Sequence, residues 1–157
     1  MNVQYLSKKD AKELSKAAKE IGFDFEPEKI IVIDKDSKIL IGNGIFILSE
    51  NRLLPFIADK RVDLLPEISV DEGAIKHIIN GASVMRPGVT KIDEKVKKDG
   101  IVKVTFGKQV ICLGFSLYDS SEMKKLEKGV VVKNVHRKGD KFWVTVSEYL
   151  ATLKQKR

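Results

Sequence analysis

The apolar residues of this 157-residue chain fall largely into short β-branched runs, each interrupted by turn-forming residues. Runs bounded in this way by glycine and aspartate predict the strands of small antiparallel sheets. They lie at residues 30–33, 39–41, 45–48, 101–106, 110–118 and 130–135. No run approaches the roughly 20 apolar residues that a membrane-spanning helix needs, so we predict no membrane segment. A chain of this kind has to build its core from several short strands.

Two helices are predicted from their N-terminal signals. Residues 8–21 carry apolar residues at helical spacing, with Ser7 placed to cap the first turn and Gly22 placed to end the helix. A second helix is expected to begin at Ser69, because Ser69 and Glu72 have the spacing of a capping box.

The remaining signals complete the predicted architecture. Gly81 follows the second helix in the position of a left-handed cap, and Pro87-Gly88 predicts a type II turn. A third helix is expected at residues 120–128, and a last strand at residues 142–146 precedes a helical tail. The fold class predicted is α+β, with helices inserted between the strands of a small, partly closed barrel.

Charge separates the two halves of the chain. Residues 1–71 hold 11 basic and 13 acidic residues, whereas residues 72–157 hold 18 basic and 9 acidic residues. An excess of cations confined to one half is expected where that half faces a polyanion such as RNA, although solubilising lysine gives the same count. We place the boundary near Ile68, which gives a small N-terminal α/β domain at 1–68 and a basic domain at 69–157.

The sequence gives little support to an enzyme, a metal site or a cofactor site. The single cysteine, Cys112, cannot form an internal disulfide, and with two histidines it cannot build a multi-Cys/His zinc site. His77 has no nucleophile or carboxylate partner at a suggestive spacing, so we expect a surface histidine. We predict no catalytic residue, no metal ligand and no cofactor. Because the N-terminus lacks the apolar core of a signal peptide, we expect a cytoplasmic protein.

Two stretches carry a family resemblance: VDEGAIK at 70–76 and GASVMRPGV at 81–89. They resemble the opening of PUA domains, the RNA-binding module named for pseudouridine synthases and archaeosine transglycosylases. The segments GK at 107–108, CLG at 112–114 and NVH at 134–136 are similar to one branch, the malignant-T-cell-amplified-sequence family of translation factors. The resemblance implies a pre-PUA domain at 1–68 and a PUA-type pseudo-barrel at 69–157. The short N-terminal segment is typical of an archaeal member.

The resemblance also implies where RNA binds. In PUA domains the loop after the first helix approaches the nucleic-acid backbone, which selects a set of residues in and before that loop: Lys76, Gly81, Ala82, Arg86, Pro87 and Gly88. We rank Arg86 first, because an arginine can fork to a phosphate and this one lies in a polar loop with no evident packing role. A second group, His136, Arg137 and Lys138, is expected at a hairpin turn, where it either touches RNA or is merely exposed. The lysines of residues 91–98 either widen this surface or are only solvated.

The function that these features predict is a non-enzymatic RNA-binding protein of translation. The resemblance implies structured RNA as partner, either tRNA through its acceptor end or rRNA of the small ribosomal subunit, in initiation, reinitiation or recycling. It also implies an initiation-factor-like protein partner for the N-terminal domain. Two alternatives stay open: a ribosome-biogenesis PUA protein, and a protein-protein adaptor whose basic surface meets acidic partners.

Overall fold

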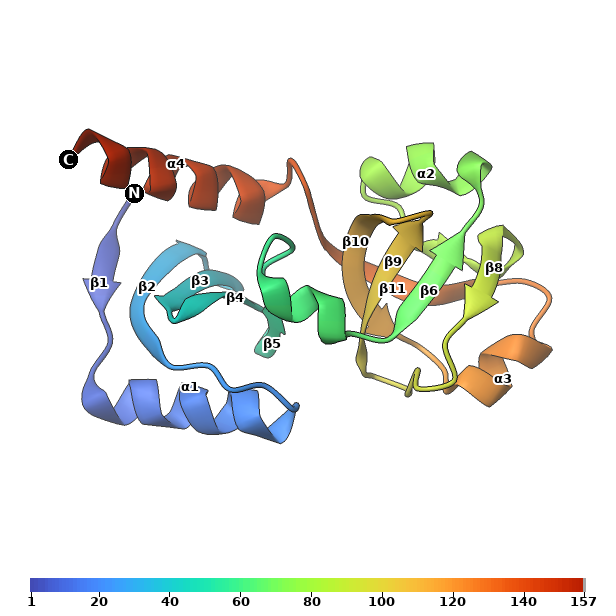
Figure 1. The fold of residues 1–157 in the computed structure, drawn as a ribbon, viewed down its shortest axis with the longest axis horizontal. Coiled ribbons are helices and arrows are strands. Elements are labelled where there is room, and N and C mark those ends of the chain that lie inside the picture. The colour runs from blue at the N-terminus through green and yellow to red at the C-terminus, as the bar shows by residue number, and fades with distance from the viewer. Residues whose placement is uncertain (157) are drawn as a thin grey trace. The chain divides into compact units, whose positions relative to one another are not determined.

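A computed structural model describes residues 1–156, which form two compact units (Figure 1). Unit 1 contains Met1–Arg61 together with the chain from Gly139 onward, and unit 2 contains Val62–Lys138. This division differs from the predicted boundary near Ile68, because the chain returns to the first unit after residue 138 instead of ending within the second. The short 3-10 helix η1 (Lys60–Leu64) lies where the chain passes from one unit to the other.

Unit 1 is built on a five-stranded antiparallel sheet in which each strand pairs with its neighbours in sequence. Its order is β1 (Val3–Tyr5), β2 (Pro27–Asp34), β3 (Ser37–Gly42), β4 (Gly44–Ser49) and β5 (Arg52–Pro55). Ile31, Ile39 and Ile47 are paired across three strands and are all buried. Helix α1 (Lys8–Glu20) begins as predicted, with the Ser7 hydroxyl accepting the Asp10 N–H at 3.0 Å.

The last helix of the chain, α4 (Lys141–Gln155), belongs to unit 1 and corrects the predicted strand at 142–146. The Asp140 carboxylate caps it by accepting the Trp143 N–H at 2.8 Å. Phe142, Val146 and Tyr149 are buried, and their spacing of four and three residues places them on one helix face. This face packs against β2 and β3, on the side of the sheet opposite α1 (Figure 1).

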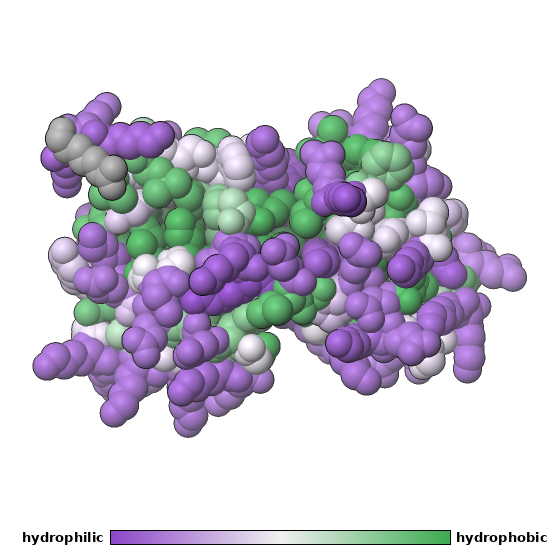
Figure 2. Space-filling view, in the orientation of Figure 1, coloured by the Kyte–Doolittle hydropathy of each residue, from purple (hydrophilic) through white to green (hydrophobic). Residues whose placement is uncertain are grey.

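Two contacts tie the start of α4 to unit 1. The Lys141 Nζ lies 2.9 Å from Asp34 Oδ2 at the end of β2. This hydrogen bond, together with the Asp36 backbone N–H, holds the pKa of Asp34 below its ordinary value. Trp143 stacks on Phe56 with ring centroids 5.6 Å apart, so its ring packs within unit 1. Apolar side chains also reach the surface of unit 1 beside α4 (Figure 2). On α4 itself, Val144 is 48% exposed.

Unit 2 is a six-stranded sheet curled into a nearly closed barrel. Its order is β7 (Val84–Met85), β11 (Val130–Arg137), β10 (Gln109–Ser116), β9 (Ile101–Phe106), β6 (Glu67–Val70) and β8 (Val89–Ile92). The two edge strands, β7 and β8, are consecutive in the chain and are joined by the three-residue 3-10 helix η2 (Arg86–Gly88). A sheet whose edges are joined by three residues has to curl round on itself. The barrel that the strand pattern predicts is therefore confirmed, and η2 lies at its seam.

The helices of unit 2 are α2 (Glu72–Ile79) and α3 (Ser120–Lys125). The predicted cap of α2 at Ser69 is wrong: Asp71 caps the helix, its Oδ1 accepting the Ala74 N–H at 2.9 Å. Ser69 lies instead in β6, where it pairs in parallel with Thr105 of β9. Apolar side chains from all six strands form the barrel core, including Ile68, Val84, Val104, Cys112 and Val132.

Candidate nucleic-acid interface

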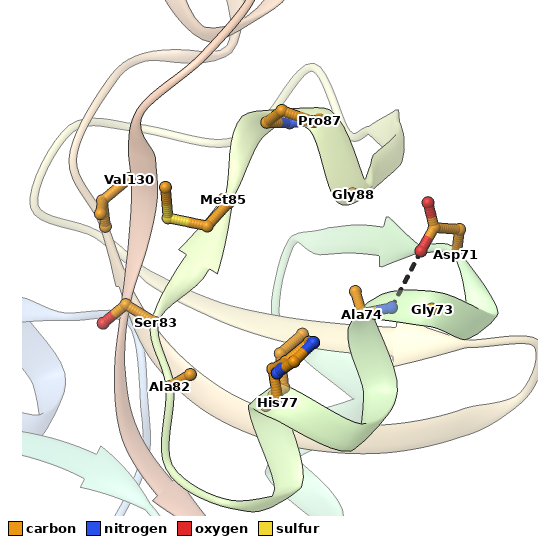
Figure 3. A pocket seen from close by; sticks show the side chains of 11 residues that line it. Asp71, Gly73, Ala74, His77, Ala82, Ser83, Met85, Pro87, Gly88 and Val130 are labelled. Atoms are coloured by element: carbon orange, nitrogen blue, oxygen red, sulfur yellow. Dashed lines mark hydrogen bonds between the residues drawn. The ribbon is translucent and has the colours of Figure 1, made fainter.

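A groove of about 600 Å³ lies between helix α2 and the segment 82–88 of unit 2 (Figure 3). One wall is the exposed side of α2 and the other is β7 with η2, while the start of β11 closes the side between them. Its lining is formed by Asp71, Gly73, Ala74, His77, Ile78, Ala82, Ser83, Met85, Pro87, Gly88 and Val130. The groove therefore lies at the seam of the barrel, where η2 joins the two edge strands β7 and β8.

Small residues bring the two walls close together at one end of the groove. A Cβ built on Gly88 would lie 3.1 Å from the Cβ of Ala74, so a larger residue would push η2 away from the helix. The Asp71 N–H donates to the Gly88 carbonyl at 2.9 Å and fixes this approach. The predicted type II turn is wrong, because Pro87 and Gly88 continue a 3-10 helix and Gly88 has no positive φ. Glycine is needed here for close approach.

The other end of the groove is held by the C-terminal cap of α2, which is formed as predicted. Gly81 has a φ of +101°, and the Ala82 N–H donates to the His77 carbonyl at 3.0 Å. Asn134 of β11 holds this turn against the barrel, because its Nδ2 donates to the carbonyls of Ile78 at 2.9 Å and Ala82 at 3.0 Å. Hydrogen bonds to the backbone carbonyls of His77, Ile78 and Ala82 thus fix the turn that borders the groove.

The chemistry of the groove suits a flat, partly apolar ligand. Met85 is 49% exposed and Val130 is 38% exposed, and the two pair across β7 and β11 along the groove wall. The His77 ring projects between the walls, and the Asp71 carboxylate stands at the narrow end (Figure 3). Exposed apolar and imidazole faces accept an unstacked nucleobase, and a carboxylate oxygen accepts a hydrogen bond from an exocyclic amine.

The predicted loop residues fall into different surroundings. Ala82, Pro87 and Gly88 line the groove, and Gly81 lies at its end. Lys76 is exposed on α2 but does not line the groove.

The second predicted group is divided by strand β11, which runs two residues further than expected. His136 is fully buried and pairs with Leu113, so it cannot meet RNA, and this candidate is corrected. Arg137 donates from Nε to the Ile79 carbonyl at 2.8 Å, which brings its guanidinium beside Gly81 at the C-terminal end of α2. Lys138 is exposed just beyond the strand.

Arg86 also departs from its prediction. Its side chain does not line the groove but turns toward α3, where Nε donates to the Met123 carbonyl at 2.9 Å and Nη1 to the Val89 carbonyl at 3.4 Å. The expectation that Arg86 has no packing role is therefore wrong, since the residue ties the seam of the barrel to α3.

Sequence reasoning missed eight residues of the groove lining: Asp71, Gly73, Ala74, His77, Ile78, Ser83, Met85 and Val130. A signal for His77 was present, because residues 73, 74, 77 and 78 share one face of an α-helix and include the glycine and alanine that let a neighbouring segment approach. Met85 carried no such signal, since its exposure depends on pairing with residue 130.

A curled six-stranded barrel with a groove between its first helix and the seam defines a PUA-domain protein, and the model of the PUA-domain family matches residues 66–138. The chain belongs to the malignant T-cell-amplified sequence family. It is 33% identical to human malignant T-cell-amplified sequence 2 over 128 residues, which cover 75% of this chain and 71% of that protein.

Other relatives agree with this assignment. The uncharacterized protein MJ1432 of Methanocaldococcus jannaschii is 35% identical over 88% of this chain and 93% of its own length. Translation machinery-associated protein 20 of Schizosaccharomyces pombe is 34% identical over 68% of this chain and 65% of its own. Among solved structures, a hypothetical protein of Pyrococcus horikoshii superposes with a TM-score of 0.69 at 29% identity, covering 92% of this chain and 99% of that one.

Within residues 1–156, His, Cys, Asp and Glu side chains do not gather in groups of three or more that could hold a metal ion. None of the helices in that range is long and apolar enough to span a bilayer.

Proposed function

We propose that this protein is a non-enzymatic RNA-binding factor of the translation machinery, and that the groove beside α2 holds the unpaired 3′ end of a transfer RNA. The groove carries this proposal, because its exposed apolar and imidazole faces offer stacking surfaces to bases that a duplex would keep hidden. A relative whose name places it in the translation machinery supports the process. The expected place of action is the cytoplasm, on the small ribosomal subunit during initiation, reinitiation or recycling.

Cations placed beside the groove support the same ligand. Net charge does not separate the two units, because unit 2 holds 14 basic and 10 acidic residues and unit 1 holds 15 basic and 12 acidic residues. Arg137 and Lys76 stand near one end of α2, where cations would meet the sugar-phosphate backbone of a strand whose bases enter the groove. We propose that unit 1, which does not contain the groove, meets an initiation-factor-like protein partner.

The test is a titration of the purified protein with tRNA that has or lacks its 3′ CCA end, at two salt concentrations. The groove variant is Ala82→Glu, which places a carboxylate at the groove wall. Ala151→Glu on the exposed side of α4 makes the same substitution in unit 1 and serves as control. We expect the CCA end to strengthen binding, and only Ala82→Glu to lose about tenfold or more.

Other outcomes would favour the alternatives. Binding that is indifferent to the CCA end but still lost in Ala82→Glu would redirect the proposal to ribosomal RNA, as in ribosome assembly. RNA binding no stronger than that of any basic protein, and equal in both variants, would contradict the proposal and favour a protein adaptor.

A further inference from the structure

A second, smaller hollow of about 190 Å³ lies on the other side of the seam from the groove. Its lining is Arg86, Val89, Thr90, Lys91, Ile92 and Lys124, which come from η2, β8 and α3. Residues of one short segment therefore serve two sites, because Met85, Pro87 and Gly88 line the groove while Arg86 and Val89 line the hollow. Hydrophilic side chains dominate the surface around α3 (Figure 2).

The positive charge of Arg86 is fixed in place and is not neutralised. Its two hydrogen bonds go to the carbonyls of Met123 and Val89, which hold the guanidinium but carry no net charge. Within residues 1–156, its Nη2 group makes no hydrogen bond and the side chain has no acidic partner. The Nη2 group of this half-buried guanidinium can therefore donate hydrogen bonds to an oxyanion. Binding would cost little further side-chain entropy, because the guanidinium is already held in place.

The balance of charge separates this hollow from its neighbours. Two adjoining depressions share lysines with this hollow. One contains Lys91 and Lys124 together with Glu67, Asp93 and Glu94, and the other contains Lys124 together with Glu94 and Asp119. The hollow of Arg86 has three cations and no acid in its lining. The carboxylate nearest to Lys124 is Glu94 at 3.9 Å, and both side chains are so exposed that this pair is weak.

We infer that Arg86, Lys91 and Lys124 form a binding site for a single phosphate group of an RNA backbone. The volume is below the roughly 300–1,000 Å³ of pockets that enclose small molecules, which suits one oxyanion rather than a nucleotide. The three residues of η2 span at most about 11 Å, so one RNA strand can occupy the groove with its bases and reach the hollow with a neighbouring phosphate. The inference rests on the proposed function, because it takes RNA as the source of the phosphate.

The test compares two double variants that remove the same charge from unit 2. Lys91→Gln with Lys124→Gln empties the hollow of its exposed lysines and leaves the hydrogen bonds of Arg86 in place. Lys97→Gln with Lys98→Gln removes two exposed lysines that do not line the hollow. We expect the first pair to weaken tRNA binding about tenfold at low salt and to lower the slope of log affinity against log salt by about 0.7–0.9, the share of one phosphate. The control pair should change the affinity less than threefold.

Each outcome of these experiments either supports or contradicts the phosphate site. Equal effects of the two double variants, with Ala82→Glu still impaired, would overturn the phosphate site and leave the proposed function standing. If the wild-type protein does not bind RNA, the proposed function fails, and a titration with inorganic phosphate monitored by NMR then decides what the hollow binds. Shifts at the Thr90 and Lys91 amides that vanish in the double variant would assign the hollow to free phosphate, and their absence would overturn the site altogether.

Discussion

Arg86 shows what a local pattern can and cannot reveal about a residue. The sequence correctly places Arg86 in the turn after α2, and the likeness to PUA domains makes a cation at that position a candidate for RNA binding. The direction of its side chain depends on the Met123 carbonyl, which lies 37 residues further along the chain. A contact of that separation leaves no trace in the sequence around residue 86, so the groove and the hollow could not be distinguished in advance.

Arg86→Ala should lower the free energy of unfolding of unit 2 by about 1–3 kcal/mol, because two carbonyl groups lose a charged donor. Lys91→Ala is the matched control, since Lys91 lines the same hollow but is exposed, and it should change stability by less than about 0.5 kcal/mol. Urea denaturation followed by circular dichroism measures both. Equal stabilities would show that the bonds of Arg86 contribute nothing to the fold.

Among the secondary-structure elements, those defined by neighbouring residues were predicted well. The cap of α1 by Ser7 and the hairpin of β9 and β10 were right, because each depends on residues only a few positions apart. The strand predicted at 142–146 was wrong. The Phe-Trp-Val pattern is so short that it fits both the two-residue period of a strand and the 3.6-residue period of a helix. The spacing of Phe142, Val146 and Tyr149 after a capping Asp140 would have indicated the helix. Ser69 was misassigned because its parallel pairing with β9 is non-local.

The burial pattern of α4 predicts which of its residues stabilise unit 1. Phe142→Ala should cost about 3–5 kcal/mol, because Phe142 is 2% exposed and its removal leaves a cavity. Val144→Ala on the same helix should change stability by less than about 0.5 kcal/mol, since Val144 is 48% exposed. Hydrogen exchange read residue by residue should show the loss in the strands of unit 1. A loss of similar size in both variants would contradict the assignment of the buried face.

At the scale of the whole molecule, the sequence predicted two modules and a basic second half but missed that unit 2 is inserted into unit 1. Composition could not show this, because the segment from Gly139 onward resembles an ordinary C-terminal tail until its partners, β2 and β3, are known. The barrel was predicted from strand spacing, whereas the groove and the hollow arise only when its two edges are joined by η2.

The two units each contain one natural reporter. The only cysteine of the sequence is Cys112, in unit 2, and the only tryptophan is Trp143, in unit 1. Burial raises the pKa of Cys112 to about 12, so a thiol reagent at neutral pH should label it only after unit 2 opens. Transfer RNA at 100 times its dissociation constant should slow the labelling about a hundredfold. An unchanged labelling rate at saturating RNA would argue against binding to folded unit 2, and Trp143 emission follows unit 1 separately.

The insertion of unit 2 between residues 61 and 139 also sets the order in which the protein can mature on the ribosome. Synthesis runs from the N-terminus, so unit 2 has all of its residues once residue 138 has emerged. Unit 1 must wait for α4, because until then the sheet face holding Ile31, Ile39 and Ile47 has no helix to cover it. The module that comes second in the sequence can therefore fold first, and the one that starts the chain is completed last. A nascent chain paused before α4 would already present the groove of unit 2 while exposing an apolar sheet to chaperones.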